Sequence, residues 1–309
     1  MNDDSASTGI AEPPVEKEKT TDSSSSTTRL ISRNGNERPG AVERKALGPP
    51  KTVWREYFES AVVTVIMALF GMTFIVQAVK VPTGSMQNTI NVGDHLLVNK
   101  FIFAPGPPLP FLPQREIKRG DIIVFKYPGN PHKDREEQMS DTENLPFKTN
   151  YVKRVIGLPG DRVEVRGDRV LINNLPLPEQ AVMAKNENEK APLVTDTVQP
   201  RRADESYTVY YYPETMEAAR AGRSLRLGSD FRYAVNGEPA TVPPDSYFVM
   251  GDNRDNSSDG RVWGFVKREY VVGRAMFVYW SYDESAPSSN PFSDFFNNTR
   301  WGRTGTMIK

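Results

Sequence analysis

One long apolar segment stands out from an otherwise mixed pattern of polar and hydrophobic positions. Residues 61–79 contain no charged side chain. As a helix, these 19 residues span ~28 Å, close to the thickness of the hydrocarbon core of a bilayer. Trp54, Tyr57 and Phe58 precede the segment and are side chains that favour the membrane interface. The pattern predicts a single transmembrane helix within residues 51–80.

Basic residues are concentrated before the apolar segment. Arg44, Lys45 and Lys51 lie on its N-terminal side, whereas Lys80 is the only nearby charge on the other side. Because cytoplasmic flanks are enriched in Lys and Arg, this bias predicts a cytoplasmic N-terminus and an extracytoplasmic domain over residues 81–309. A cleaved leader is the main alternative. However, about 60 residues precede the apolar stretch, and the stretch is longer than the usual core of a leader, so an uncleaved anchor is favoured.

The first 50 residues have few large apolar side chains. Residues 20–28 are low in complexity and rich in Ser and Thr. Such a segment buries too little surface to offset the entropy lost on ordering. Residues 1–50 are therefore predicted to form a disordered cytoplasmic tail.

Beyond residue 81 the pattern is typical of β-structure. Apolar and β-branched runs between turn residues predict strands, and two of them flank an Arg-Gly-Asp-Arg turn and predict a hairpin. The runs are 122–127, 163–165 and 170–172 (the hairpin), 247–250 and 275–280. The fold class predicted is mostly β, with one N-terminal transmembrane helix.

Residues about 179–233 differ from the rest of this domain. They are more polar, and residues 214–220 predict a short helix. We interpret this stretch as an inserted α+β subdomain on the β scaffold.

Composition excludes several kinds of chemistry. The chain has 309 residues, with 39 Lys and Arg against 39 Asp and Glu, so no charge bias indicates nucleic acid. It has no cysteine, which excludes thiolate nucleophiles and thiolate metal sites. A Ser-His-Asp triad would need His95, in a probable strand, or His132, in a loop. We interpret both as ordinary surface or strand-edge residues.

A serine and a lysine offer a different route to hydrolysis. Ser85 follows the apolar segment closely, and Lys153 lies between predicted strands, with Val152 and Val155 nearby. An exposed lysine has a pKa of about 10.4, but burial lowers the pKa so that a neutral amine can act as a base. The pair indicates a hydrolase that works where a membrane meets water.

Four segments occur in order after the apolar span, and together they resemble the type I signal peptidase family, the membrane-bound Ser–Lys class of leader peptidases. They are Pro-Thr-Gly-Ser-Met-Gln-Asn-Thr at 82–89, Gly-Asp-Ile-Ile-Val-Phe at 120–125, Tyr-Val-Lys-Arg-Val-Ile-Gly-Leu-Pro-Gly-Asp at 151–161, and Gly-Asp-Asn-Arg-Asp-Asn-Ser-Ser-Asp-Gly-Arg at 251–261. The resemblance extends over roughly residues 60–280.

The resemblance implies roles for three residues in bond cleavage. Ser85 corresponds to the nucleophile, which forms an acyl-enzyme, and Lys153 corresponds to the general base. The family builds its oxyanion hole from the nucleophile's backbone N–H and a hydroxyl two residues earlier, which corresponds to Thr83 here. Many relatives carry Ser at that position, and the extra methyl of Thr restricts its χ1 angle.

The segment 251–261 supplies supporting residues by the same resemblance. Ser257 corresponds to a serine that hydrogen-bonds the base lysine, and Asp259 and Arg261 correspond to residues that hold the site together. Three further charges are equally compatible with a turn of solvated ion pairs and with support of the site; they are Asp252, Arg254 and Asp255.

The resemblance also implies a substrate class and partners. The family cuts after small residues, usually Ala-X-Ala, and Val81, Met86 and Val152 are close enough in sequence to the pair to line shallow apolar pockets. The expected partners are exported pre-proteins bearing signal peptides, the lipid bilayer of the plasma membrane and the protein export machinery. No cofactor, metal or nucleic acid is implied.

Two alternatives remain at this point. One is a self-cleaving, repressor-type Ser–Lys protease, which shares the pair but is cytosolic, in contrast to the apolar span 61–79. The other is a catalytically inactive binding protein tethered to a membrane, against which the presence of both Ser85 and Lys153 argues.

Overall fold

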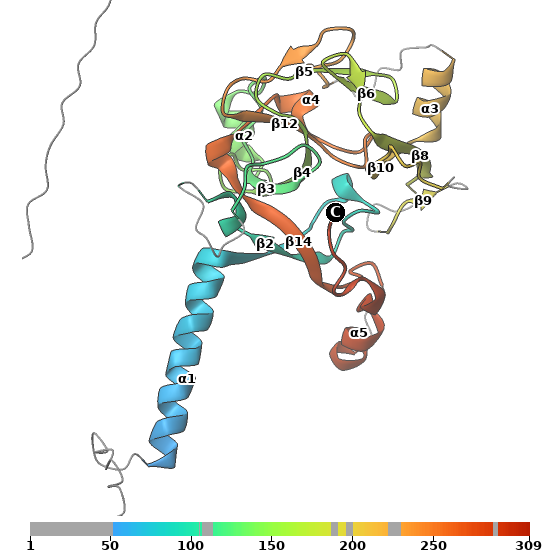
Figure 1. Ribbon diagram of the computed structural model, residues 1–309. Helices are drawn as coiled ribbons and strands as arrows, with labels where there is room; N and C mark the ends of the chain where they lie inside the picture. The colour runs from blue at the N-terminus through green and yellow to red at the C-terminus, as the bar shows by residue number, and fades with distance from the viewer. Residues whose placement is uncertain are drawn as a thin grey trace, which may run out of the picture. The chain divides into compact units, whose positions relative to one another are not determined.

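The strands of the described chain form three sheets and make up the larger part of its regular structure (Figure 1). The computed structural model describes residues 52–104, 106, 114–186, 191–195, 200–221, 230–286 and 290–309. The tail predicted for residues 1–50 lies outside these described residues. The prediction of a mostly β protein with one N-terminal apolar helix is confirmed.

The apolar helix ends earlier than the sequence pattern predicted. Helix α1 (Val53–Phe70) continues into a π-helical turn, η1 (Gly71–Ile75). Together these 23 residues are long and apolar enough to cross a membrane, and no residue of α1 is buried. The helix lies within the predicted range of residues 51–80, but the predicted span of 61–79 is wrong at its C-terminal end.

The last part of that predicted span forms a strand. β1 (Val76–Lys80) pairs antiparallel with β2 (Asp94–Asn99) along its whole length. Backbone hydrogen bonds to β2 replace the helical ones, so the helix stops at Ile75. Valine-rich sequence suits a buried helix and a strand alike, which is why the pattern alone did not locate this boundary.

The largest sheet has seven strands, and every neighbouring pair in it is antiparallel. Its order is β1-β2-β14-β3-β4-β12-β13. The strands predicted at 122–127, 247–250 and 275–280 are confirmed as part of it. Beyond β1 and β2, its members are β3 (Ile122–Lys126), β4 (Asn150–Gly157), β12 (Ser246–Met250), β13 (Val266–Lys267) and β14 (Val271–Ser281).

Lys153 lies inside β4, opposite Ile123 of β3, and the prediction that it lies between strands is wrong. Lys153 and Arg154 place two successive charges in the middle of this strand, which obscures its β pattern. Their side chains are only 3% and 2% exposed. The partners that allow this burial come from distant parts of the chain, so the local sequence does not reveal them.

The second sheet contains the predicted hairpin. β5 and β6 pair antiparallel around a turn in which Gly167 has φ +59°, a conformation that glycine adopts without strain. The order is β11-β5-β6-β7. Its strands are β5 (Arg162–Arg166), β6 (Arg169–Ile172), β7 (Leu175–Pro176) and β11 (Ala240–Thr241).

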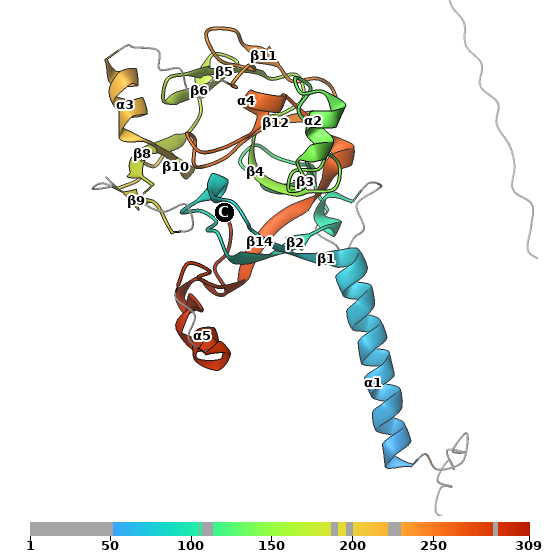
Figure 2. The same ribbon diagram turned by 180° about the vertical axis from the view of Figure 1, so that it is seen from behind.

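The third sheet is small and lies beside helix α3 (Pro213–Arg220), as the view from behind shows (Figure 2). The order is β10-β8-β9, with β10 parallel and β9 antiparallel to β8. The helix predicted at 214–220 is confirmed. The strands are β8 (Glu179–Lys185), β9 (Val194–Thr195) and β10 (Tyr207–Tyr211).

The remaining elements are short helical turns that follow or join the strands. They are η2 (Gly84–Met86), η3 (Phe101–Phe103), α2 (Arg135–Ser140), α4 (Gly260–Trp263), η4 (Arg268–Tyr270), α5 (Pro291–Asn297) and η5 (Trp301–Arg303).

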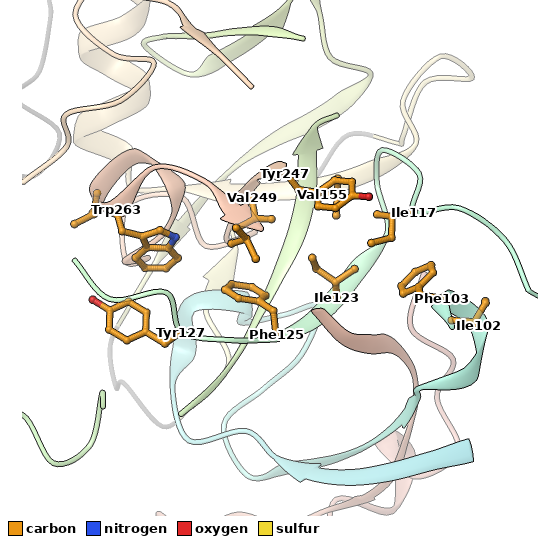
Figure 3. Close-up of a cluster of buried hydrophobic side chains, with 12 residues drawn as sticks. Ile102, Phe103, Ile117, Ile123, Phe125, Tyr127, Val155, Tyr247, Val249 and Trp263 are labelled. Carbon is orange, nitrogen blue, oxygen red and sulfur yellow. The ribbon is translucent and has the colours of Figure 1, made fainter. Parts of the chain in front are cut away.

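Two apolar clusters pack around the large sheet and fix β4 between its neighbours. The first joins Ile123 and Phe125 of β3 to Val155, Val249 and Trp263 (Figure 3). The second includes Met86 and Ile90 from the segment after β1 and Leu96 from β2. Burial of each such side chain contributes about 1.5–3 kcal/mol. The strand that carries Lys153 is therefore anchored in the apolar core.

Candidate active site

Ser85 lies on the 3₁₀ turn η2, shortly after β1. The turn is closed by hydrogen bonds from Gln87 N to Gly84 O (3.0 Å) and from Ile90 N to Met86 O (2.7 Å). Met86 and Ile90 are 1% and 0% exposed and anchor the turn in the apolar core. The apolar residues of this segment thus fix the backbone that carries the Ser85 hydroxyl.

The structure brings Ser85 and Lys153 together across 68 residues of sequence. The Lys153 Nζ atom lies 2.5 Å from Ser85 Oγ, within hydrogen-bond distance. Ser85 is 9% exposed, and the Lys153 Nζ atom also lies 5.4 Å from the centroid of the Tyr151 ring. Both side chains are therefore largely withdrawn from bulk water.

Burial lowers the pKa of Lys153 from its ordinary value of 10.5 to about 8. Desolvation is the largest cause, because the charged ammonium loses its hydration. The Asp259 carboxylate opposes this and raises the pKa, whereas Arg261 lowers it. At pH 7 roughly a tenth of the molecules would carry a neutral amine, against fewer than one in a thousand for a free lysine.

Asp259 and Arg261 form a buried ion pair beside this amine. Arg261 donates from Nε and Nη2 to the two Asp259 oxygens, at 2.9 and 2.8 Å, and both side chains are at most 1% exposed. Asp259 also accepts from the Gly251 N–H, and Arg261 donates to the Arg254 carbonyl. The pair ties together the loop 251–261.

Ser257 lies next to Ser85 but makes no hydrogen bond to Lys153. Its Oγ atom is buried and has no hydrogen-bond partner among the described residues. A Cβ atom at Gly251 would lie 2.3 Å from Ser257 Oγ and 2.4 Å from the Ser85 carbonyl oxygen. Only glycine at 251 therefore lets these two serines approach, but the lysine contact implied by the resemblance is not present.

Thr83 and the three predicted pocket residues occupy different settings. Thr83 is exposed and extended, with φ −125° and ψ 153°, and its side chain forms no cap hydrogen bond. Val81 and Met86 are 5% and 1% exposed and belong to one apolar cluster, against which Val152 packs. The three apolar residues thus meet, but the Met86 side chain is buried in the core.

Asp252 and Arg254 are buried, so the alternative of a solvated turn is excluded for both. Arg154 donates from Nε and Nη2 to the two oxygens of Asp252, at 2.8 and 2.7 Å. Arg254 forms a second bidentate pair with Glu179, and the two side chains are 0% and 5% exposed.

Sequence reasoning missed Arg154 and Glu179. For Arg154 one signal existed: a second charge directly after Lys153, surrounded by apolar residues. For Glu179 no local signal was present.

The two histidines make no contribution to this arrangement. The His95 ring packs against Trp280 with a centroid distance of 4.7 Å, and the His132 ring lies 5.7 Å from that of Tyr233. His95 is not at a sheet edge, because β2 has strands on both sides. In the part of the chain that the structure describes, no group of three or more His, Asp or Glu residues is arranged to hold a metal ion.

Comparison with known proteins gives a consistent match. A family model described as signal peptidase, peptidase S26, matches residues 54–280. Signal peptidase I of Pseudomonas fluorescens is 33% identical over 253 residues, which cover 76% of this chain and 76% of that protein. Signal peptidase I of Pseudomonas aeruginosa is 31% identical over 272 residues, covering 83% of this chain and 82% of that protein.

A crystal structure of a signal peptidase I from Enterococcus faecalis aligns with 52% of this chain and 97% of its own, at 29% identity. The TM-score of 0.25 is too low to support a statement about the fold. The family match, by contrast, includes Ser85, Lys153 and the loop 251–261. Since that match spans most of the sequence and both Pseudomonas relatives align over most of their own length, the chain belongs to the signal peptidase family, peptidase S26.

Proposed function

We propose that Ser85 and Lys153 are the catalytic dyad of this chain. As a member of the signal peptidase family, the chain is a serine endopeptidase that removes signal peptides from pre-proteins. The observation that carries the dyad is the 2.5 Å separation of Ser85 Oγ and Lys153 Nζ in a buried setting. The comparisons favour neither a self-cleaving repressor nor an inactive binding protein.

In the proposed reaction, the neutral Lys153 amine accepts the Ser85 hydroxyl proton while Ser85 Oγ attacks the scissile carbonyl carbon. The C–N bond then breaks, and the Lys153 ammonium donates the proton to the departing amine of the mature protein. This leaves an acyl-enzyme on Ser85. A water molecule, deprotonated by Lys153, attacks the ester; as the acyl C–O bond breaks, the Lys153 ammonium returns the proton to Ser85 Oγ and the signal peptide is released. The lowered pKa of Lys153 supports these proton transfers near neutral pH.

The negative charge that develops on the carbonyl oxygen during the reaction must be stabilised by hydrogen-bond donors. We propose the Ser85 backbone N–H and the Thr83 hydroxyl for this role. The Thr83 side chain is exposed and forms no cap hydrogen bond, so it is available to a substrate. Removal of one such donor typically lowers the rate by ~10²–10³-fold.

Three further residues around the dyad act by positioning in this proposal. The buried Asp259–Arg261 pair sets the electrostatic environment of Lys153 and fixes the loop that approaches Ser85. The unpartnered Ser257 hydroxyl lies close enough to the Ser85 backbone to bind a group that arrives with substrate. The apolar surroundings of Val81 and Val152 suit the small side chains of an Ala-X-Ala sequence.

The domain organisation is also part of the proposal. The apolar helix crosses the plasma membrane, residues 1–50 precede it on the cytoplasmic side, and the domain from residue 81 onward is extracytoplasmic. The basic flank before the helix supports this orientation. Residues about 179–233 form an inserted subdomain, supported by the separate sheet β8–β10. The bilayer and the protein export machinery are the partners that bring pre-proteins to the site.

Cleavage of a pre-protein tests the proposal directly. The full chain in detergent is incubated with a pre-protein, and the new N-terminus is sequenced. Wild-type protein should cut after an Ala-X-Ala sequence, and Ser85→Ala and Lys153→Ala should not cut. His95→Ala and His132→Ala serve as matched controls and should remain active. Cleavage by Ser85→Ala, or loss of cleavage in both folded histidine variants, would refute the dyad.

A further inference from the structure

The backbone that carries Ser85 is held by the loop that follows β12. Asn253 donates from its backbone N–H to the Ser85 carbonyl (3.1 Å) and from Nδ2 to the Gly84 carbonyl (3.1 Å). The Ser85 turn, residues 84–90, is therefore held in two ways: by hydrogen bonds within the turn and by hydrogen bonds from the loop 251–254.

The sheet β8–β10 is hydrogen-bonded to the same loop through Tyr210 of β10. The Tyr210 N–H donates to the Asp252 carbonyl at 2.8 Å, and the Arg254 N–H donates to the Tyr210 carbonyl at 2.9 Å. These two bonds form a short parallel bridge between β10 and the loop (Figure 1). The buried ion pair of Arg254 with Glu179, at the start of β8, reinforces the same contact.

The same part of the chain also reaches the Ser85 turn directly. Asn88 donates from Nδ2 to the Leu193 carbonyl at 3.2 Å and accepts from the Leu193 N–H at 2.9 Å. Gln87, which is fully buried, donates from Nε2 to the Ala191 carbonyl at 2.7 Å. Leu193 itself is 5% exposed, so this contact is shielded from water.

Asn88 is suited to this contact in two respects. Its φ of +69° lies in the left-handed region, which asparagine tolerates better than most residues. Its carboxamide offers a donor and an acceptor together, so it pairs with Leu193 as a peptide group in a neighbouring strand would. A residue without the amide would leave the Leu193 backbone groups unpaired in a shielded place.

We propose that residues 179–186, 191–195 and 200–212 act as a clamp that holds Ser85 in position toward Lys153, and that Asn88 is the positioning residue that joins the Ser85 turn to this clamp. The inference rests on the proposed role of Ser85 as the nucleophile. The clamp acts at two places. It binds the loop 251–254 through β10, and it binds the Ser85 turn directly through Leu193. Loss of one contact should misplace the Ser85 hydroxyl while leaving substrate binding intact.

The test compares two glycine substitutions at positions with the same backbone conformation. Asn88→Gly keeps the left-handed conformation and removes both bonds to Leu193. Asn236→Gly makes the same change at an exposed turn residue with φ +57° and serves as the matched control. Each full-length variant in detergent is assayed with a quenched Ala-X-Ala peptide for kcat, KM and the pH dependence of kcat/KM, with the unfolding midpoint measured in parallel.

We expect Asn88→Gly to lower kcat about 10-fold or more, because small errors in the placement of reacting groups are costly. Its KM should change less than about 2-fold, and its acid limb should stay at the wild-type pH, since Lys153 is not disturbed. Asn236→Gly should match the wild type. Asn88→Asp keeps the acceptor for Leu193 N–H but loses the donor, so its kcat should fall between the two.

A wild-type kcat in Asn88→Gly would overturn the inference. If Asn88→Gly does not fold, Asn88→Asp decides, and a wild-type kcat in that variant overturns the inference equally. Ser85→Ala in the same assay separates the two proposals. Activity in Ser85→Ala refutes the dyad, whereas an inactive Ser85→Ala with a fully active Asn88 variant refutes only the clamp.

Discussion

Arg154 forms a buried bidentate ion pair with Asp252, with N–O distances of 2.7 and 2.8 Å. Arg154 directly follows Lys153 in β4, so the two side chains leave the strand on opposite faces. One strand therefore directs Lys153 at Ser85 and, with the next residue, fixes the loop that supports Ser85. Thr89 adds to this link by donating to the same carboxylate at 2.7 Å.

The first prediction concerns this ion pair. Arg154→Ala leaves the Asp252 carboxylate buried without its countercharge, which should cost about 3–5 kcal/mol in the free energy of unfolding. Arg202→Ala breaks an exposed pair with Asp204 and should not change stability measurably. Denaturant unfolding of both variants in detergent measures the difference. Equal stability of the two variants would mean that the buried pair does not stabilise the fold.

The second prediction is a pH profile. In the proposed reaction the neutral form of Lys153 is the base, and burial lowers the pKa of Lys153 to about 8. Activity should therefore rise with pH through about 8 and level off well below the ordinary pKa of lysine. Lys153→Arg should be inactive at every pH, because guanidinium does not lose its proton in proteins. An acid limb of kcat/KM near 6.5 would instead indicate a histidine base.

The third prediction follows from the same lowered pKa, now as a contribution to stability. Between pH 8 and 10.5 the unfolded chain binds more protons at Lys153 than the folded chain does, so raising the pH favours the folded state in this window. Lys153→Met has no such dependence. The stability of Lys153→Met relative to wild type should be greatest below pH 8 and should fall steadily toward pH 10.5. A difference that is constant with pH would contradict the lowered pKa.

The fourth prediction tests the Thr83 hydroxyl. Thr83→Val keeps the branched shape and removes the donor, so kcat should fall about 10²-fold or more. Thr83→Ser keeps the donor and should retain most of the activity. Steady-state cleavage of a quenched peptide gives both values. If Thr83→Val is as active as wild type, the hydroxyl takes no part in stabilising the oxyanion.

The fifth prediction concerns where the catalytic domain begins. A variant that lacks residues 1–50 should cleave pre-protein at the wild-type rate. Of two soluble variants, one that begins at Val76 should be more stable than one that begins at residue 81, because the second loses all of β1 from the sheet. Unfolding midpoints and cleavage of a soluble peptide compare them. Equal stability would show that β1 is dispensable.

Much of the fold could be predicted from the sequence where a signal was local. The strand at 122–127 and the hairpin around Gly167 follow from apolar runs and turn residues, and both are present. The boundary at Ile75 could not be predicted, because the pairing partner that turns Val76–Lys80 into a strand comes later in the chain. Hydropathy alone does not distinguish the end of a helix from the start of such a strand.

The candidate site was predictable to the extent that its residues belong to recognisable segments. Ser85 and Lys153 were identified from sequence, and the structure places them in contact. The flanking valines indicated an apolar setting for Lys153, but its distant partners were not visible in the sequence of β4, and neither was the link from Glu179 to Arg254 across 75 residues. Such contacts depend on tertiary packing, which no spacing rule in one sequence encodes.

The direct passage from η1 into β1 limits how far Ser85 can lie from the end of the apolar helix. No linker separates Ile75 from Val76, and β1 is hydrogen-bonded to β2 along its length. Ser85 follows Ile75 by ten residues, which even fully extended reach only about 33–36 Å. When α1 is anchored in a bilayer, the site around Ser85 is therefore held at a fixed distance from the membrane surface. The pre-protein must then bridge the distance between the membrane and the site. The length of chain between its apolar segment and its cleavage site therefore determines whether it can be cut.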